Sequence, residues 1–436
     1  MIRPREHFPD TLYSPWCRAW IRVVGSHGQR LANWLDGNPQ STVAAAIRVD
    51  WDTLVSTLPR LVVDLEAGAA EDLSLVRTYG CLLELEARHR GESRRWFAPP
   101  PEIEAAGRRY ALVPPTRKTA RPPDAPATTF KLSSQVGIAG AHGLEYCWVP
   151  LEDDDILDWH REAALDAVLA NPRLRLGLAP CATHEQMTWH LDDQAPRGRD
   201  GRMPLRCGGA KDAATLWPVI ESLLTAAYRE EVQVLLLPEL ILDEAMLAQC
   251  RDWLERQNLP SPRLRLIVAG TRHCGEGNDF ANRCTVLDQG GALLWEQDKR
   301  SPFVIDDRGA LARLSPGCRA QAAFEPTILG RQLAVRESAA GRLLTPICLD
   351  FIEGALWSEL GADIFLVPAM SPGLERFRDR ARDMGTRHGA ASFVCNAQCA
   401  GQERERYVAY LPIRRSLPPT ALPGHELFIL DVQLYV

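Results

Sequence analysis

The sequence predicts an α/β fold for its C-terminal part, from about residue 171 to 436. Short apolar runs that suit strands alternate there with segments long enough to form helices. Uninterrupted apolar runs such as VQVLLL are typical of strands in a sheet that helices cover on at least one face. Apolar residues make up 46 % of the chain and charged residues 24 %, so the chain can bury a substantial core.

The first 170 residues predict a mainly helical region. Two segments between Val43 and Arg90 repeat Leu, Val, Ile and Ala at helical spacing, with a break expected near Pro59. A proline-rich linker is expected over about 113–129, because its prolines suit neither a helix nor a central strand. The run from Leu151 to Leu169 begins acidic and becomes apolar at helical spacing, which predicts a helix leading into the next domain.

Length and charge narrow the class of protein. A chain of 436 residues has room for two or three domains. Its net charge of -6 and pI near 6.0 argue against a dominant nucleic-acid or anionic-membrane surface. No apolar run approaches the roughly 20 residues of a membrane helix, and the opening segment lacks the apolar core of a signal peptide. Twelve scattered cysteines without CxxC pairs indicate reduced thiols. A cytoplasmic protein is expected.

Three residues that carry chemistry stand at predicted strand ends. Glu239 follows the run VQVLLL and a proline, Lys299 follows ALLWEQ, and Cys348 ends RLLTPIC before the turn DFIEG. The carboxyl ends of strands in α/β sheets are where binding sites usually form. Taken singly, each has a plainer interpretation: a solvated glutamate, a solvated lysine and a buried structural cysteine.

The joint order of these residues resembles the nitrilase, or carbon-nitrogen hydrolase, superfamily. The family has a strand ending in Pro-Glu, a lysine after a hairpin that follows an Asn-containing strand, and a cysteine in a motif like ICYD. This chain offers LLLPEL, ANRCTVLDQGGALLWEQDK and PICLDFIEG, then GADIFLVPAMSP and RHGAASFVCNA with Asn396 near its end. The resemblance implies a four-layer α-β-β-α sandwich over residues 171–436, with Cys348 as nucleophile, Glu239 as general base and Lys299 as the cation beside the oxyanion. It implies no metal and no organic cofactor.

The chemistry of these groups fits those roles. A thiol is mostly protonated at neutral pH, so it needs a neighbouring base or cation to become nucleophilic. An ammonium stabilises the negative charge of a tetrahedral intermediate, and the backbone N–H of Leu349 is a candidate second donor. Because Cys348 is followed by Leu-Asp, the motif resembles the amidase branches, which favours a non-peptide amide over a nitrile as substrate.

The family's second glutamate is not evident in this sequence. The candidates between Lys299 and Cys348 are Asp306, Asp307 and Glu325, in a segment that is longer than usual for the family. A rival hypothesis is therefore a catalytically weak nitrilase-like module used for binding or assembly.

Two other constellations carry less weight. Cys181, His184 and His190 lack a convincing fourth metal ligand, and a pair of Cys348 with His388 has no local support. The expected partners are a small amide-type substrate, further copies of the chain in a homodimer or larger homo-oligomer, and a protein bound by the N-terminal region. Neither membrane nor nucleic acid is expected as a partner.

Overall fold

The computed structural model describes most of the chain in separate ranges, and it divides into two compact units. The units are Met1–Pro115 with Thr119–Asp154, and Thr116–Lys118 with Asp155–Val436. The described residues are 10–20, 22–23, 27–68, 71–88, 100, 102–105, 108–113, 147–163, 173–191, 202–257, 264–276, 279–314, 320–325, 330–338, 341–397, 406–412, 420–422, 424 and 426–433. The division falls at Asp154 and Asp155, before the expected domain boundary at about residue 170.

The first unit begins with helices, as the sequence predicts. These are α1 (Asp10–Trp20), α2 (Gly28–Gly37), α3 (Gln40–Ile47), α4 (Trp51–Glu66) and α5 (Asp72–Arg88). Their buried faces share one apolar core that includes Trp16, Trp20, Leu58 and Tyr79. A Cβ on Gly80 would lie 2.4 Å from the carbonyl oxygen of Ile47, so the missing side chain allows α3 to lie directly against α5.

The expected break at Pro59 is wrong. Pro59 lies inside α4, and the two expected segments are separated later, between Glu66 at the end of α4 and Asp72 at the start of α5. A further interruption falls earlier, between α3 and α4. Asp50 begins the new helix because its side chain accepts a hydrogen bond from the N–H of Thr53 at 2.9 Å. A proline within a helix costs a backbone hydrogen bond, but the burial of Leu54, Leu58 and Leu61 on one face keeps α4 continuous.

A three-stranded antiparallel sheet completes the first unit. It consists of β1 (Glu102–Ala105), β2 (Arg108–Val113) and β3 (Cys147–Leu151). The linker expected over 113–129 starts at the last residue of β2 and otherwise lies outside the described residues.

The helix expected from Leu151 to Leu169 is not found where that segment is described. Leu151 ends β3, and β4 (Ile156–Arg161) follows. Burial alternates along β4, with Leu157 and Trp159 buried and Ile156 exposed, which is the period of a strand. Pairing with β14, a strand distant in the sequence, favours the extended conformation over the helix that the local pattern predicted. Residues 164–169 lie outside the described residues.

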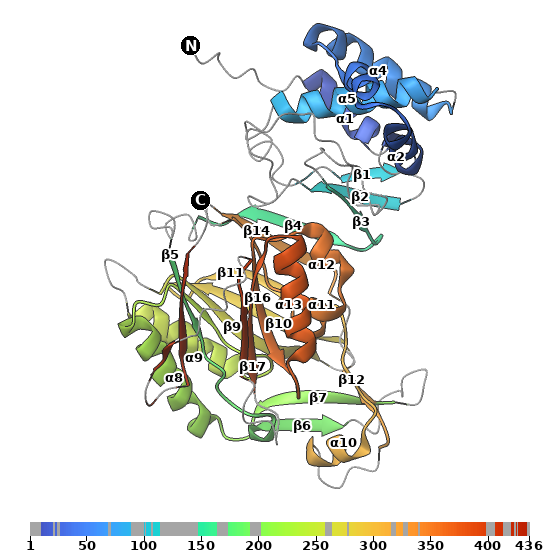
Figure 1. Ribbon diagram of the computed structural model, residues 1–436. Coiled ribbons are helices and arrows are strands. Elements are labelled where there is room, and N and C mark those ends of the chain that lie inside the picture. Colours follow the sequence, from blue (N-terminus) through green and yellow to red (C-terminus); the bar gives the residue numbers. More distant parts are fainter. Residues whose placement is uncertain are drawn as a thin grey trace. The chain divides into compact units, whose positions relative to one another are not determined.

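The second unit contains two large sheets, shown in Figure 1. The first has seven strands in the order β11 (Leu293–Asp298), β10 (Asp279–Asp288), β9 (Leu266–Glu276), β8 (Val234–Leu236), β5 (Arg173–Leu178), β20 (Phe428–Gln433) and β19 (Thr420–Ala421). The second has six strands in the order β18 (Tyr407–Tyr410), β17 (Ala391–Ala397), β16 (Ile364–Met370), β15 (Gly341–Leu344), β14 (Gln332–Ser338) and β4. The central strands of each sheet run parallel.

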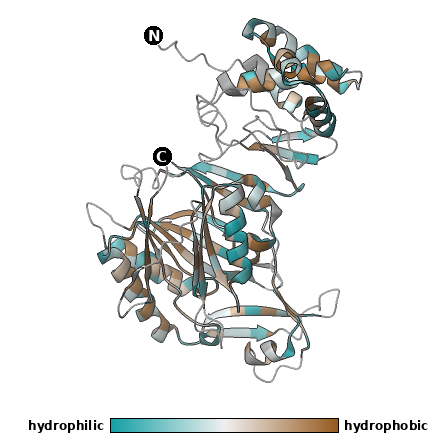
Figure 2. Cartoon of the chain, viewed as in Figure 1, coloured by the Kyte–Doolittle hydropathy of each residue, from teal (hydrophilic) through white to brown (hydrophobic). Residues whose placement is uncertain are grey.

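Helices cover the outer faces of both sheets, so the second unit is the predicted α-β-β-α sandwich. Helices α8 (Ala213–Arg229) and α9 (Glu244–Arg256) share a core with the seven-stranded sheet. Helix α13 (Glu375–Arg387) packs on β17 and β18, next to the short helices α11 (Leu349–Glu353) and α12 (Ala355–Leu360). Figure 2 shows mostly hydrophobic central strands and a hydrophilic α13. No helix in the described part of the chain is long and apolar enough to span a membrane.

Buried polar contacts join the two sheets near one edge. The amide group of Gln297 on β11 donates to the carbonyl of Gln332 and accepts from the N–H of Ala334, each at 2.8 Å. The indole N–H of Trp295 donates to Thr345 at 3.2 Å. These contacts fix the register of one sheet against the other, because a shift would leave buried polar groups unpaired.

A small accessory sheet forms from two distant segments. Its order is β12 (Val304–Ile305), β13 (Ala323–Phe324), β7 (Met203–Ala210) and β6 (Met187–Leu191), and α10 (Arg308–Leu314) lies between β12 and β13 in sequence. The long segment between Lys299 and Cys348 therefore supplies half of this sheet.

Candidate active site

Glu239 lies where the chain leaves the seven-stranded sheet after β8. Pro238 precedes it and cannot donate to the strand ladder. Gly270 on β9 has a φ of 70°, and a Cβ there would lie 2.1 Å from the carbonyl oxygen of Pro238, so this approach requires glycine. The N–H of Glu239 donates to Ala369 at 3.3 Å, and its Oε2 accepts from the N–H of Met370 at 2.9 Å. Both bonds attach Glu239 to β16 of the other sheet.

Lys299 follows β11 and is almost completely buried. Its backbone N–H donates to Asn282 at 2.8 Å. Its Nζ lies 2.8 Å from Oε1 of Glu239 and 2.8 Å from Oε2 of Glu325. Burial would lower the pKa of Lys299, but the two carboxylates outweigh it and raise that pKa well above its ordinary value. The ammonium is therefore charged at every physiological pH.

Cys348 lies after β15, at the turn that leads into α11. Its N–H donates to Pro368 on β16 at 3.0 Å. Its φ of 48° and ψ of -107° are values that residues with a side chain rarely adopt. Leu349, the next residue, is the first of α11, a position whose backbone N–H has no partner within the helix. The elbow thus combines a buried thiol with a helix-initial N–H group beside it.

The surroundings of Cys348 keep its thiol protonated at rest. Burial raises the pKa of Cys348 most, and the charge of Glu239 and a hydrogen bond to its carboxylate raise it further. Lys299 and the backbone of Met370 act in the opposite direction but do not outweigh these effects. A protonated thiol beside a carboxylate is the starting arrangement for proton transfer to that carboxylate.

The three candidates for a second glutamate have different positions. Glu325, directly after β13, is fully buried against Lys299. Asp306 pairs with Arg202 at 3.0 Å and is largely exposed. Asp307 is exposed, and its side chain accepts from the N–H of Gly309 at 2.7 Å at the start of α10. Of the three, the structure brings Glu325 to Lys299.

The accessory sheet explains the position of Glu325. β13 pairs in parallel with β7, so the residue after β13 is carried to the edge of the sandwich where Lys299 lies. The N–H of Glu325 donates to Phe303 at 2.9 Å, and the N–H of Phe303 donates to Oε2 of Glu325 at 3.2 Å. Burial would raise the pKa of Glu325, but Lys299 and a hydrogen bond from His273 offset that effect, and the pKa lies below its ordinary value. Glu325 is therefore a buried anion.

Asn282 and His273 belong to the same cluster, and sequence reasoning assigned neither a role. The Nδ2 of Asn282 donates to Glu239 at 2.9 Å and to Glu325 at 2.7 Å. Nε2 of His273 lies 2.9 Å from Oε1 of Glu325. Asn282 lies in the Asn-containing strand of the family pattern, which was the one available signal, whereas a lone histidine in a strand gives none.

Asp350 ties the segment after Lys299 to the turn that holds Cys348. Its carboxylate accepts from the N–H of Arg300 at 3.1 Å, of Ser301 at 2.6 Å and of Ile347 at 3.4 Å. Burial raises the pKa of Asp350 to about 6, although these N–H groups and the Lys299 ammonium partly offset the effect.

Asn396 closes the same edge of the sandwich. It lies at the end of β17, and its side chain exchanges two hydrogen bonds with the backbone of Ser371, of 2.8 and 3.0 Å. The segment that follows Met370, the last residue of β16, is thereby fixed.

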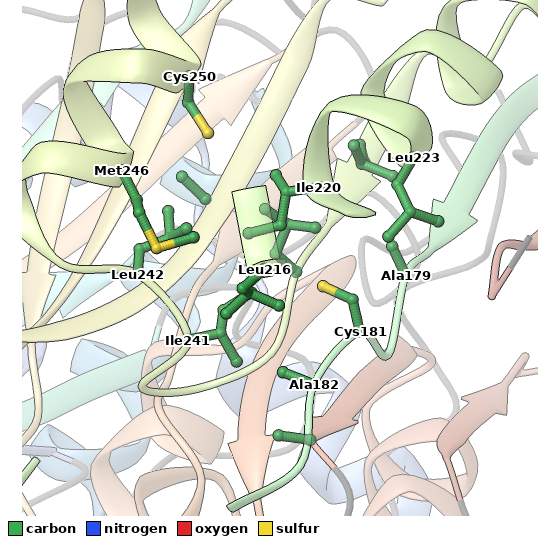
Figure 3. Packing of buried hydrophobic residues seen from close by; sticks show 14 of the residues in the cluster. Ala179, Cys181, Ala182, Leu216, Ile220, Leu223, Ile241, Leu242, Met246 and Cys250 are labelled. Atoms are coloured by element: carbon green, nitrogen blue, oxygen red, sulfur yellow. The ribbon is translucent and has the colours of Figure 1, made fainter. Parts of the chain in front are cut away.

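The alternative constellations lie away from this cluster. Cys181 belongs to the apolar core under α8, where Figure 3 shows it near Leu216 and Ile220. His388 follows α13 and precedes β17, whose first residue pairs with Ile364 at the start of β16. Cys348 bonds to Pro368, four residues further along β16, or about 13 Å at the rise of a strand. His388 is therefore at the opposite end of the sheet from the thiol.

Comparisons with known proteins give structural neighbours only. No family model matches the sequence, and no curated protein matches it. An amidase from Nesterenkonia sp. is 16 % identical, and the match covers 60 % of this chain and 90 % of that chain with a TM-score of 0.39. Nit3 of Saccharomyces cerevisiae, a member of branch 10 of the nitrilase superfamily, is 14 % identical over 63 % of this chain and 93 % of its own, with a TM-score of 0.38.

A third solved structure shares part of its length with this chain. The NitFhit protein of C. elegans is 14 % identical over 60 % of this chain and 61 % of its own, with a TM-score of 0.41. These neighbours are nitrilase superfamily members, the family that the sequence resembles.

Proposed function

We propose that this protein is a thiol-dependent hydrolase that cleaves a non-peptide C–N bond through an acyl-enzyme on Cys348. One observation carries the proposal: the buried Lys299 ammonium lies 2.8 Å from the carboxylates of both Glu239 and Glu325. The Glu239 carboxylate also accepts a hydrogen bond from the Cys348 thiol. Burying an ammonium and two carboxylates is costly, and clusters of this kind are concentrated at functional sites.

Acylation uses all three groups. The Cys348 sulfur attacks the carbonyl carbon of the amide while its proton passes to Glu239. The carbonyl oxygen becomes an oxyanion, and Lys299 and the N–H of Leu349 stabilise it. When this intermediate collapses, the C–N bond breaks, and Glu239 returns the proton to the departing nitrogen. The products are a thioester on Cys348 and a free amine or ammonia.

Deacylation repeats the same transfers with water. Glu239 takes a proton from water as its oxygen attacks the thioester carbon, and the oxyanion again forms beside Lys299. Collapse breaks the C–S bond, and Glu239 returns the proton to sulfur. A carboxylic acid leaves and the resting thiol is restored, so the cycle needs no metal and no organic cofactor.

Burial of the site favours a small substrate. Cys348 is 5 % exposed and Lys299 1 %, so a polypeptide segment has little access to the sulfur. A compact amide or carbamoyl compound is the class that we propose. The position of Glu325 also supports an enzyme over a catalytically weak assembly module, because that rival was motivated in part by the lack of an evident second glutamate.

The decisive experiment is detection of the acyl group on Cys348. The full chain is mixed with a panel of small amides, quenched in acid within milliseconds to seconds, and mapped by peptide mass. We expect a mass increase equal to the acyl group on the peptide containing Cys348 in the wild type and none at that position in Cys348→Ala. Cys274→Ala, which removes a half-buried cysteine of β9, is the matched control and is expected to acylate normally. Full hydrolytic activity in Cys348→Ala would contradict the proposal.

The proposal also covers the cellular compartment, the oligomeric state and a partner protein. A free thiol at Cys348 is required, and the nine cysteines whose side chains the structure describes are free, which supports the reducing cytoplasm. Family resemblance supports a homodimer or larger homo-oligomer, which sedimentation of the full chain would test. The N-terminal unit is proposed to recruit a partner protein.

A further inference from the structure

His273 is a buried group of the cluster to which the mechanism above gives no task. It lies on β9, its side chain is 5 % exposed, and both of its ring nitrogens have partners. Nδ1 lies 2.9 Å from the backbone nitrogen of Cys207 on β7, and Nε2 lies 2.9 Å from Oε1 of Glu325.

These two contacts determine which nitrogen carries the proton. The backbone N–H of Cys207 can only donate, so Nδ1 must accept and carries no hydrogen. The proton of the neutral ring is then on Nε2, which donates to the Glu325 carboxylate. A doubly protonated ring would place an N–H on Nδ1 against the N–H of Cys207. The neutral ring with its hydrogen on Nε2 therefore satisfies both neighbours.

The position of His273 joins the accessory sheet to the sandwich. Cys207 lies on β7, and Glu325 follows β13, the strand that pairs with β7. β13 itself is only two residues long, so few strand hydrogen bonds locate the residue after it. One imidazole from the seven-stranded sheet thus binds both neighbouring strands of the accessory sheet at the point where Glu325 enters the site.

The carboxylate of Glu325 has a different partner on each oxygen. Oε1 accepts from His273 and from Asn282 at 2.7 Å, while Oε2 accepts from Lys299 and from the N–H of Phe303. Rotation of the carboxylate would break all of these contacts. Holding Oε1 therefore fixes the direction from which Oε2 meets the ammonium.

We propose that His273 is a positioning residue, which acts through Glu325 to hold the Lys299 ammonium where the oxyanion forms. The inference rests on the proposed function, since it assigns Lys299 to the transition state. A residue that orients a charge needed only in the transition state should affect the acylation rate more than substrate binding.

Two amide variants separate positioning from packing. In His273→Gln the side chain reaches as far as Nε2, so its amide nitrogen can donate to Glu325 while its oxygen accepts from Cys207. In His273→Asn the side chain reaches only to the position of Nδ1, so it can serve Cys207 but not Glu325. Both variants are neutral and polar, and thermal unfolding measured on each will show whether their stabilities match.

The measurement is the single-turnover rate of Cys348 acylation at a series of amide concentrations. We expect His273→Asn to lower the saturating rate by about 10- to 100-fold, the effect of losing one hydrogen bond to a buried charge, with little change in the half-saturating concentration. His273→Gln should stay within about threefold of wild type because both hydrogen bonds are retained. Equal rates in the two variants, whether both fast or both slow, would overturn the proposal.

Failure of this inference is distinguishable from failure of the proposed function. If the wild type forms no acyl adduct with any amide, the function itself is contradicted. If the wild type forms the adduct and His273→Asn forms it equally fast, the function stands and the role of His273 is contradicted.

Discussion

The two sheets of the sandwich contribute different chemistry to the site. The seven-stranded sheet supplies charged and polar side chains, which bind one another or Glu325. Glu239 and Lys299 follow the strands β8 and β11, and His273 and Asn282 lie within β9 and β10. The six-stranded sheet supplies a neutral thiol on a rarely adopted backbone conformation and the N–H of Met370. Buried charged groups need partners, so the side chains from the seven-stranded sheet form a hydrogen-bonded network, which we call the network half of the site. A thiol can be buried without such partners.

The comparison predicts that the network half is the more sensitive to loss of charge. In Lys299→Met two buried carboxylates lose their cation, and the oxyanion loses its charged donor. We expect kcat/KM for a small amide to fall by about 10³-fold. The free energy of unfolding should fall by roughly 3–5 kcal/mol, as measured by urea denaturation.

A surface cation provides the control for that prediction. Arg376 pairs with Glu353 on the exposed side of α13, so Arg376→Met should change the free energy of unfolding by less than about 0.5 kcal/mol. Activity of Lys299→Met within tenfold of wild type would show that the cation is not part of the chemistry.

Asp350 joins the segment after Lys299 to the turn that holds Cys348, and the pH dependence of the free energy of unfolding tests this link. Its pKa is raised to about 6 in the folded chain, so the protonated form favours folding. That contribution is fully present below about pH 4 and is lost as the pH rises to about 6, by up to about 3 kcal/mol. Asp350→Asn cannot titrate, so the wild type should lose its advantage over this variant across that range. Urea unfolding at pH 4, 5, 6 and 7 measures the difference, and a constant gap would contradict the burial effect.

Glu325 tests whether the accessory sheet belongs to the network half. Glu325→Gln removes one of the two charges that hold Lys299, and we expect kcat to fall by about 10- to 100-fold. The matched controls are Asp306→Asn and Asp307→Asn, which change exposed carboxylates of the same segment and should leave kcat within about twofold of wild type. Steady-state rates that fall equally in all three variants would mean that Glu325 contributes no more to kcat than the two exposed carboxylates.

The smallest expected effect concerns Asp155, the first residue of the second unit after Asp154. Its carboxylate binds the guanidinium of Arg300 at 2.6 Å, and Arg300 is the neighbour of Lys299 in sequence. Asp155→Asn keeps the shape but weakens this bond, so we expect a loss of about 1 kcal/mol in the free energy of unfolding and a smaller change in kcat. Asp153→Asn, an exposed change two residues earlier, is the control. Equal free energies of unfolding in Asp155→Asn and Asp153→Asn would mean that the bond between Asp155 and Arg300 does not stabilise the fold.

The residues that follow the strands of the sandwich were predictable, because the apolar runs that precede them can be read directly from the sequence. Glu239, Lys299 and Cys348 each follow an apolar run, and the structure places all three at one edge of the sandwich. The choice among Asp306, Asp307 and Glu325 was not predictable, since it depends on the parallel pairing of β13 with β7, more than a hundred residues apart. His273 escaped notice for the same reason, because both of its partners come from other strands.

The N-terminal half shows where local patterns mislead. Pro59 indicated a break, yet three leucines on one face hold α4 together across it. The segment after Leu151 carried acidic residues and apolar spacing that suit a helix, but β4 forms because β14 offers an unpaired edge. In both cases tertiary contacts outweigh a local preference of a few tenths to a few kcal/mol.

The left-handed backbone of Cys348 has an energetic consequence. Glycine adopts such angles without steric cost, whereas cysteine does so at an expense of about 1–3 kcal/mol. A glycine at this position would therefore relax the turn and raise the free energy of unfolding, but the thiol would be lost. Under the proposed function, a cysteine at this position lowers the free energy of unfolding in exchange for a nucleophile, whereas a purely architectural module would gain stability from glycine there.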